Sequence, residues 1–113
     1  MTKRKSTAKA VLSNLHALRE RRYVGDLDAS DTLIDFERAV QKAELTARQA
    51  EAIRLHYYDG YKQAKVAEIM GVDFTRVSHY ISEATEELDE VYEMWAWMDG
   101  ELSAEDFIEG EAE

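Results

Sequence analysis

Residues 45–84 have the sequence LTARQAEAIRLHYYDGYKQAKVAEIMGVDFTRVSHYISEA, and this stretch decides the fold. Thr46 and Gln49 form a T-x-x-Q capping box, which predicts a helix that starts at about residue 47. The Asp59-Gly60 pair is a strong stop signal for that helix. Its apolar side is predicted to comprise Ala50, Ile53, Leu55 and Tyr57.

Two further helices follow this first one. The second is predicted from about Lys62 to Met70, with Ala64, Val66, Ala67 and Ile69 mostly inward. Residues 71–73 (Gly-Val-Asp) turn the chain, and Asp73 can cap a third helix that starts near Phe74. In this third helix Val77 and Ile81 are predicted to face inward. Two short helices joined by a tight glycine turn are the pattern of a helix-turn-helix.

The 13 residues that match a known family lie inside this stretch. Residues 31–90 resemble region 4 of bacterial sigma factors and the phage sigma-like regulators related to it. The resemblance implies a helix-turn-helix that contacts promoter DNA, and preceding helices that contact RNA polymerase. The matching positions are Leu45, Thr46, Arg48, Gln49, Ile53, Leu55, Tyr57, Gly60, Ala64, Ala67, Met70, Gly71 and Val72.

The recognition helix supplies most of the candidate DNA contacts. Its first turns enter the major groove in proteins of this kind, where Arg reads guanine and Ser or Thr reads bases or phosphates. The start of the preceding helix is predicted to face phosphates. The alternative is that these are ordinary solvent-facing side chains. The candidates are Lys62, Gln63, Lys65, Thr75, Arg76, Ser78, His79 and Ser82. Phe74, Tyr80 and Glu83 stand where the family usually carries Arg or Lys.

Charge is distributed unevenly along the 113 residues, whose formal net charge is −10. Residues 1–22 hold seven Lys or Arg against one Glu, whereas residues 23–82 hold seven basic and ten acidic residues. Residues 83–113 hold thirteen acidic residues and no basic one. A basic head and an acidic tail suggest separate roles for the two ends, or docking of one end on the other.

Composition favours a wholly helical protein. The chain has no Cys, which excludes disulfides and thiolate metal sites, and no Pro, which suits helices. No apolar run approaches the roughly 20 residues that span a membrane, so we expect a soluble cytoplasmic protein. We predict an all-α fold with three parts. Residues 1–30 form a basic helix and linker, residues 31–84 the helix-turn-helix domain, and residues 85–113 an acidic helical extension.

The basic head contains one predicted amphipathic helix, over residues 7–22. Its apolar residues recur at helical spacing and are expected to pack on the core: Ala8, Val11, Leu12, Leu15 and Leu18. Lys3 to Lys5 are expected to contact phosphates or to be disordered. Residues 23–30 are predicted to be a linker, and a helix over residues 31–43 is predicted to present Leu33, Ile34, Phe36, Ala39 and Val40.

The acidic tail continues the recognition helix. Apolar residues from Val77 to Met98 step by four and three, which is heptad spacing, and this predicts one long helix through to Gly100. The stripe could support a homo-oligomer through residues 77–98, or fold back to complete the core. Tyr92, Trp95, Trp97 and Met98 are candidate partner-binding residues, because aromatic side chains are enriched at interface hot spots. A short last helix is predicted at about residues 104–109.

The sequence predicts a DNA-binding transcriptional regulator, acting with RNA polymerase or alone. Two alternatives remain open. One is a DNA-packaging subunit of the small-terminase kind, in which residues 77–98 assemble the subunits. The other is a protein-interaction module whose helix-turn-helix contacts protein rather than DNA. We expect no enzyme and no cofactor, because His16, His56 and His79 are scattered and the chain lacks a phosphate-binding glycine loop.

Overall fold

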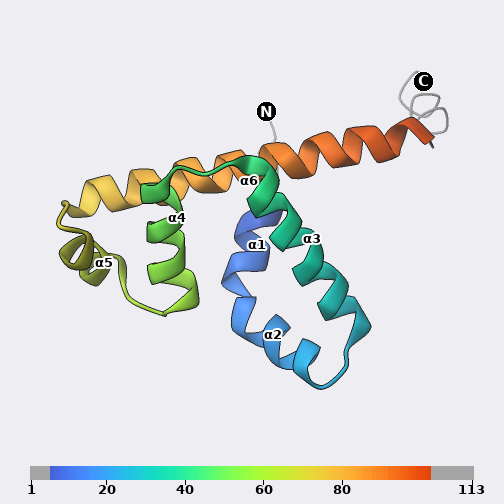
Figure 1. Ribbon diagram of the computed structural model, residues 1–113, viewed down its shortest axis with the longest axis horizontal. Helices are drawn as coiled ribbons and strands as arrows, with labels where there is room; N and C mark the ends of the chain where they lie inside the picture. The colour runs from blue at the N-terminus through green and yellow to red at the C-terminus, as the bar shows by residue number, and fades with distance from the viewer. Residues whose placement is uncertain (1–5, 103–113) are drawn as a thin grey trace.

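The long helix α6 is the scaffold on which four of the other five helices pack (Figure 1). The computed structural model describes residues 6–102, and side chains up to Met98. Within this range the chain forms six α-helices, one π-helical turn and no strand, which confirms the predicted all-α class. The elements are α1 (Thr7–Ser13), α2 (Leu15–Tyr23), α3 (Leu27–Ala43), α4 (Ala47–Ile53), the π-helical turn η1 (Arg54–Tyr58), α5 (Gln63–Met70) and α6 (Phe74–Leu102).

The stripe of α6 forms the spine of the hydrophobic core. Its buried members are Val77, Ile81, Ala84, Leu88 and Val91, and they pack against α4, α3, α5 and α1. The predicted inward positions are confirmed as far as Val91. Because the other helices of the same chain cover this stripe, heptad spacing here reflects packing on several short helices rather than a free coiled-coil seam.

The N-terminal region departs from the predicted single helix over residues 7–22. It forms two helices, α1 and α2, which meet at Asn14. The Asn14 side-chain amide donates to the Ala10 carbonyl oxygen at 2.8 Å, and such local side-chain bonds compete with a continuous helix. The break lets α1 contact α6 while α2 packs on α3. The five predicted apolar residues are all buried, so the predicted face is confirmed and the predicted continuity is wrong.

The linker predicted over residues 23–30 is also wrong at its C-terminal end. Helix α3 begins at Leu27, because Asp26 caps it by accepting the Ala29 N–H at 3.2 Å. This hydrogen bond, followed by the Arg21 guanidinium at 3.0 Å, lowers the pKa of the Asp26 carboxyl from its ordinary value. The predicted helix therefore extends four residues toward the N-terminus, and Gly25, with φ 94°, makes the corner.

An acidic residue of α6 ties down the start of α1. Asp89 Oδ1 accepts the Ala8 N–H at 2.9 Å, and Asp89 Oδ2 accepts the Ser6 hydroxyl at 2.6 Å. Ser6 Oγ in turn accepts the Lys9 N–H at 3.0 Å as the N-cap of α1. Two residues separated by more than 80 positions are thus joined, and the basic head is attached to the acidic helix by a specific contact.

The first helix of residues 45–84 begins as predicted and stops at the predicted Asp59-Gly60 pair, but its last turn is π-helical. The Thr46–Gln49 capping box is present, with both of its hydrogen bonds. From Arg54 the chain widens into η1, where the Asp59 N–H donates five residues back to the Arg54 carbonyl oxygen at 2.9 Å. Four predicted inward residues are instead exposed, because each lies at the margin of its helix face: Ile34, Ala50, Ala64 and Ile69. The helix predicted at residues 104–109 and the basic residues Lys3 to Lys5 lie outside the described residues.

Candidate nucleic-acid interface

A left-handed glycine fixes the turn between α5 and α6. Gly71 has φ 72° and ψ 31°, a conformation that glycine adopts without steric cost. The Val72 N–H donates to the Ala67 carbonyl oxygen at 3.0 Å and closes the end of α5. Asp73 then caps α6, because its Oδ1 accepts the Arg76 N–H at 2.8 Å. The predicted helix-turn-helix is therefore present, and its turn sets the direction of α6.

Six of the eight side chains predicted to contact DNA are exposed. Two lie near the start of α5 and four on the first turns of α6. No side chain caps α5, which leaves its first backbone N–H groups for water or an anion. The six exposed residues are Lys62, Lys65, Thr75, Arg76, His79 and Ser82.

The remaining two predicted contacts bond to each other. The Ser78 hydroxyl donates to Gln63 Oε1 at 2.9 Å, and both side chains are half-buried where α5 meets α6. This hydrogen bond joins the first turn of α5 to the second turn of α6. Gln63 and Ser78 therefore hold the two helices in register, and Gln63 retains its amide nitrogen as a donor on this side.

The cations of α4, η1, α5 and the start of α6 are largely neutralised by their neighbours. Arg48 lies 3.7 Å from Glu51, Arg54 lies 3.0 Å from Asp59 and Lys65 lies 3.3 Å from Glu68. In the described part of the chain, Lys62 and Arg76 have no ion pair. These surface pairs are weak and can be exchanged for phosphates, but the positive potential that attracts DNA is small.

Two anchoring residues were not predicted. Arg48 Nη1 donates to the Met70 carbonyl oxygen at 3.3 Å and so ties α4 to the end of α5. Gln49 Nε2 donates to Glu83 Oε1 at 3.2 Å and ties α4 to α6. Glu83, which stands where a cation was expected, is thus occupied by a neighbouring helix. Sequence spacing could not reveal either contact, since the partners lie 22 and 34 residues apart.

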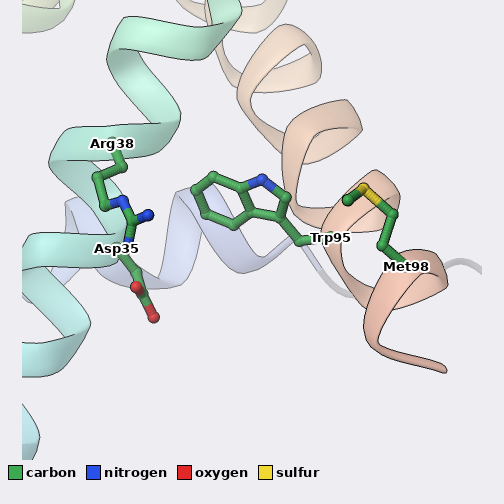
Figure 2. Close-up of a pocket in the computed structure, with 4 residues that line it drawn as sticks. All are labelled: Asp35, Arg38, Trp95 and Met98. Atoms are coloured by element: carbon green, nitrogen blue, oxygen red, sulfur yellow. The ribbon is translucent and has the colours of Figure 1, made fainter. Parts of the chain in front are cut away.

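A second surface lies between α3 and the C-terminal half of α6 (Figure 2). The Trp95 ring points from α6 toward α3, where Arg38 and Asp35 lie, and Met98 follows one turn later on α6. These four residues line a pocket of about 240 Å³. A neighbouring hollow shares Arg38 and Trp95 and extends past Lys42. We refer to this surface as the Trp95 groove.

The four candidate partner-binding residues fall into two pairs. Tyr92 and Trp95 are half-buried against the core, with ring centroids 5.7 Å apart in an edge-to-face arrangement. Burial, reinforced by the charges of Asp35 and Asp89, raises the pKa of Tyr92 to about 12. Trp97 and Met98, by contrast, are 70% and 54% exposed. Only the second pair is fully available to a partner, and Trp95 presents one part of its ring in the groove.

No site for metal chemistry is formed by the described residues. No cluster of three or more His, Cys, Asp or Glu side chains occurs among them. His56 Nδ1 lies 2.8 Å from the Tyr61 carbonyl oxygen, so this imidazole is engaged by the backbone. In the same part of the chain, no helix has the length and apolar character needed to cross a membrane.

Comparison with known proteins identifies the central helices. Residues 40–88 match the family model described as Sigma-70, region 4. This match runs from the end of α3 through α4, η1 and α5 into α6, so this stretch is a sigma region 4-like helix-turn-helix. That kind of domain is DNA-binding and non-enzymatic. No curated protein and no solved structure matches the chain significantly.

Proposed function

We propose that this protein is a DNA-binding transcriptional regulator that reads duplex DNA with the first turns of α6. The observation that carries the proposal is the match of residues 40–88 to sigma-70 region 4, over helices that present exposed polar side chains at the expected reading positions. Arg76 and His79 supply hydrogen-bond donors, and Thr75 and Ser82 supply hydroxyls. Lys62 and Lys65 flank this surface on α5 and supply positive charge for phosphates.

Few phosphates can be neutralised by this surface. With Lys62 and Lys65 each facing one phosphate, the slope of log affinity against log salt is about −2. A domain with so few phosphate contacts binds weakly alone. We therefore propose that it acts together with RNA polymerase, which supplies the remaining contacts with DNA.

A titration by fluorescence anisotropy against a random pool of duplex DNA, at two salt concentrations, tests the first part. Selection from the same pool then supplies the preferred site. We expect Arg76→Ala to weaken binding to that site by about 1–3 kcal/mol, the range for one base contact. Arg38→Ala is the matched control, since Arg38 is an exposed cation of α3 outside the helix-turn-helix. Absence of binding at low salt would favour the protein-interaction alternative.

The Trp95 groove is the surface that we propose for the protein partner. Met98 lines it and is exposed, as is the preceding residue Trp97. Exposed aromatic residues and methionines are enriched at interfaces. Binding of purified core RNA polymerase to the immobilised protein tests the proposal. We expect Met98→Ala to weaken capture, whereas Met94→Ala, at an exposed methionine of α6 that does not line the groove, leaves it unchanged. Equal capture of both variants would exclude the groove.

Burial of the heptad stripe argues against the DNA-packaging alternative. The heptad stripe needed for a ring of subunits is buried within the chain from Val77 to Val91. Sedimentation equilibrium distinguishes a packaging ring from a regulator, because a ring has many times the mass of the 13.0 kDa chain. We expect a monomer or a dimer.

A further inference from the structure

The tip of the recognition helix carries an exposed aromatic ring. Phe74 is the first residue of α6 and is 54% exposed, whereas the other two apolar residues that follow at helical spacing, Val77 and Ile81, are buried. A single exposed apolar side chain is ordinary on a protein surface. The position of Phe74 is unusual for such a side chain, because the N-terminal residues of a recognition helix are the ones that contact base edges.

The backbone holds this tip in a fixed position. The cap of Asp73 on the Arg76 N–H and the left-handed Gly71 define where α6 begins. Phe74 and Thr75 follow directly, and both are exposed. A phenyl ring and a threonine methyl group are therefore carried by adjacent residues at a helix end whose backbone is fixed by its cap.

Polar reading groups are scarce at the same tip. Between residues 71 and 82, Arg76 is the only Lys or Arg. Ser78 is already bonded to Gln63, and Glu83 is bonded to Gln49. The leading surface of α6 is thus more apolar than a helix that reads guanine with several cations.

Only one base presents an apolar group in the major groove. Thymine carries its C5-methyl there, and Phe or the methyl of Thr makes apolar contact with it. A phenyl ring against the edge of a G·C pair would instead cover an amino or carbonyl group without bonding it, which is unfavourable. We propose that Phe74 and Thr75 form a thymine-methyl-reading site, so that the DNA target carries thymine at the positions facing the start of α6. This inference rests on the proposed DNA binding.

Uracil substitution isolates the methyl group. A site selected from the random pool is resynthesised with each thymine replaced in turn by deoxyuridine, which keeps the Watson–Crick pair and removes only the methyl. We expect one or two positions to lose affinity by about three- to fivefold, the effect of one buried methyl group. The remaining thymines should be insensitive.

Variants of the tip assign the effect to its residues. Phe74→Ala combined with Thr75→Ser, which removes both apolar groups, should bind the thymine and uracil duplexes equally at the sensitive positions, as a double-mutant cycle requires. Phe74→Leu, which keeps an apolar side chain, should retain part of the difference. Ile69→Ala is the matched control, because Ile69 is an exposed apolar residue at the end of α5 and should keep the full difference. Phe74 lies outside the buried core, so thermal unfolding should show that all three variants are folded.

The outcomes separate the two proposals. If the full chain binds duplex DNA with the expected salt dependence but every uracil duplex binds as well as its thymine parent, thymine reading is overturned and DNA binding stands. If a methyl effect persists in Phe74→Ala combined with Thr75→Ser, another residue reads that methyl and the assignment is overturned. If the chain binds no duplex at low salt, DNA binding fails and thymine reading fails with it. An exposed Phe74 would then indicate an apolar protein partner.

Discussion

At the scale of single residues, Asp89 joins the C-terminal helix α6 to the N-terminal helix α1. Its carboxylate accepts hydrogen bonds from the Ser6 hydroxyl and the Ala8 N–H, and so acts as a cap supplied from a distant helix. Negative charge at a helix N-terminus adds favourable interaction with the helix dipole. The same residue belongs to the acidic helix α6, so one side chain links the oppositely charged ends of the sequence.

We predict that Asp89→Ala lowers the free energy of unfolding by about 1–2 kcal/mol, the usual range for losing a charged cap. Urea unfolding followed by circular dichroism measures this change. Glu90→Ala is the control, because Glu90 is its exposed neighbour on α6 and no cap depends on it. Equal stability of the two variants would mean that the head does not depend on this carboxylate.

Tyr92 makes the stability sensitive to high pH. Its hydroxyl is buried without a hydrogen-bond partner among the described residues, and its pKa is about 12 rather than 10.0. Between these values the unfolded chain releases the phenol proton and the folded chain keeps it. The free energy of unfolding must therefore fall as pH rises from about 10 to about 12.

We predict that Tyr92→Phe has a shallower fall over this pH range than the parent chain and is at least as stable below it. Part of the fall should persist, because burial also raises the pKa of Tyr57 and Tyr58. Urea unfolding at several pH values, with tyrosinate absorbance recorded in parallel, provides the measurement. Parallel curves for the two proteins would contradict the burial of this hydroxyl.

At the scale of elements, α6 has a structural role and a proposed binding role along one helix. Its buried stripe closes the core, and its exposed positions carry the candidate contacts.

Leu88 is fully buried, whereas Trp97 is 70% exposed. We predict that Leu88→Ala lowers the free energy of unfolding by about 2–5 kcal/mol, since it leaves a cavity. Trp97→Ala should change it by no more than about 0.5 kcal/mol. Urea unfolding of both variants tests this contrast, and a large loss in Trp97→Ala would contradict its exposure.

Local signals in the sequence predicted the helix starts and turns that depend on adjacent residues. The Thr46–Gln49 box, the left-handed Gly71 and the cap by Asp73 are each complete within four residues, so all three were predictable. The stripe from Val77 to Val91 was predictable because burial follows helical spacing.

Features that depend on distant contacts were not predictable. The local hydrogen bond of Asn14 to Ala10 permits a helix break, but the break also depends on the packing of α1 on α6 and of α2 on α3. The heptad stripe alone could not show whether another chain or the same chain covers it. Of the candidate site, the exposed positions followed from helix geometry, whereas the bond between Gln63 and Ser78 required the crossing of α5 over α6.

At the scale of the whole molecule, acidic residues lie at the end of α6 that is opposite the reading tip. Asp99 and Glu101 belong to the last turn of α6, whereas its first turn is the reading tip. At about 1.5 Å per residue, Leu102 lies roughly 42 Å from Phe74 along α6. Screening lengths of about 30 Å at 0.01 M salt and 8 Å at 0.15 M then decide whether this charge acts on DNA at the tip.

We predict that neutralising the five acidic residues of 103–113, by Glu→Gln and Asp→Asn changes, strengthens DNA binding at about 0.01 M salt and has no effect at about 0.15 M. Anisotropy titration at both concentrations measures this, and the chain length stays unchanged. Glu83→Gln is the comparison, since Glu83 lies near the tip and its effect should persist at the higher salt. A tail effect that survives 0.15 M salt would show that the tail lies over the reading surface.

The unbroken course of α6 has a mechanical consequence. Phe74 and Met98 are separated by roughly 36 Å of helix, a length close to one turn of the DNA double helix. A straight helix of this length is a rigid spacer. A protein bound at the Met98 end is therefore held at a constant distance and rotation from the DNA bound at the Phe74 end. A tilt of the helix at one end therefore moves the other end by a fixed amount. A kink in the middle of α6 would uncouple binding at the Phe74 end from binding at the Met98 end.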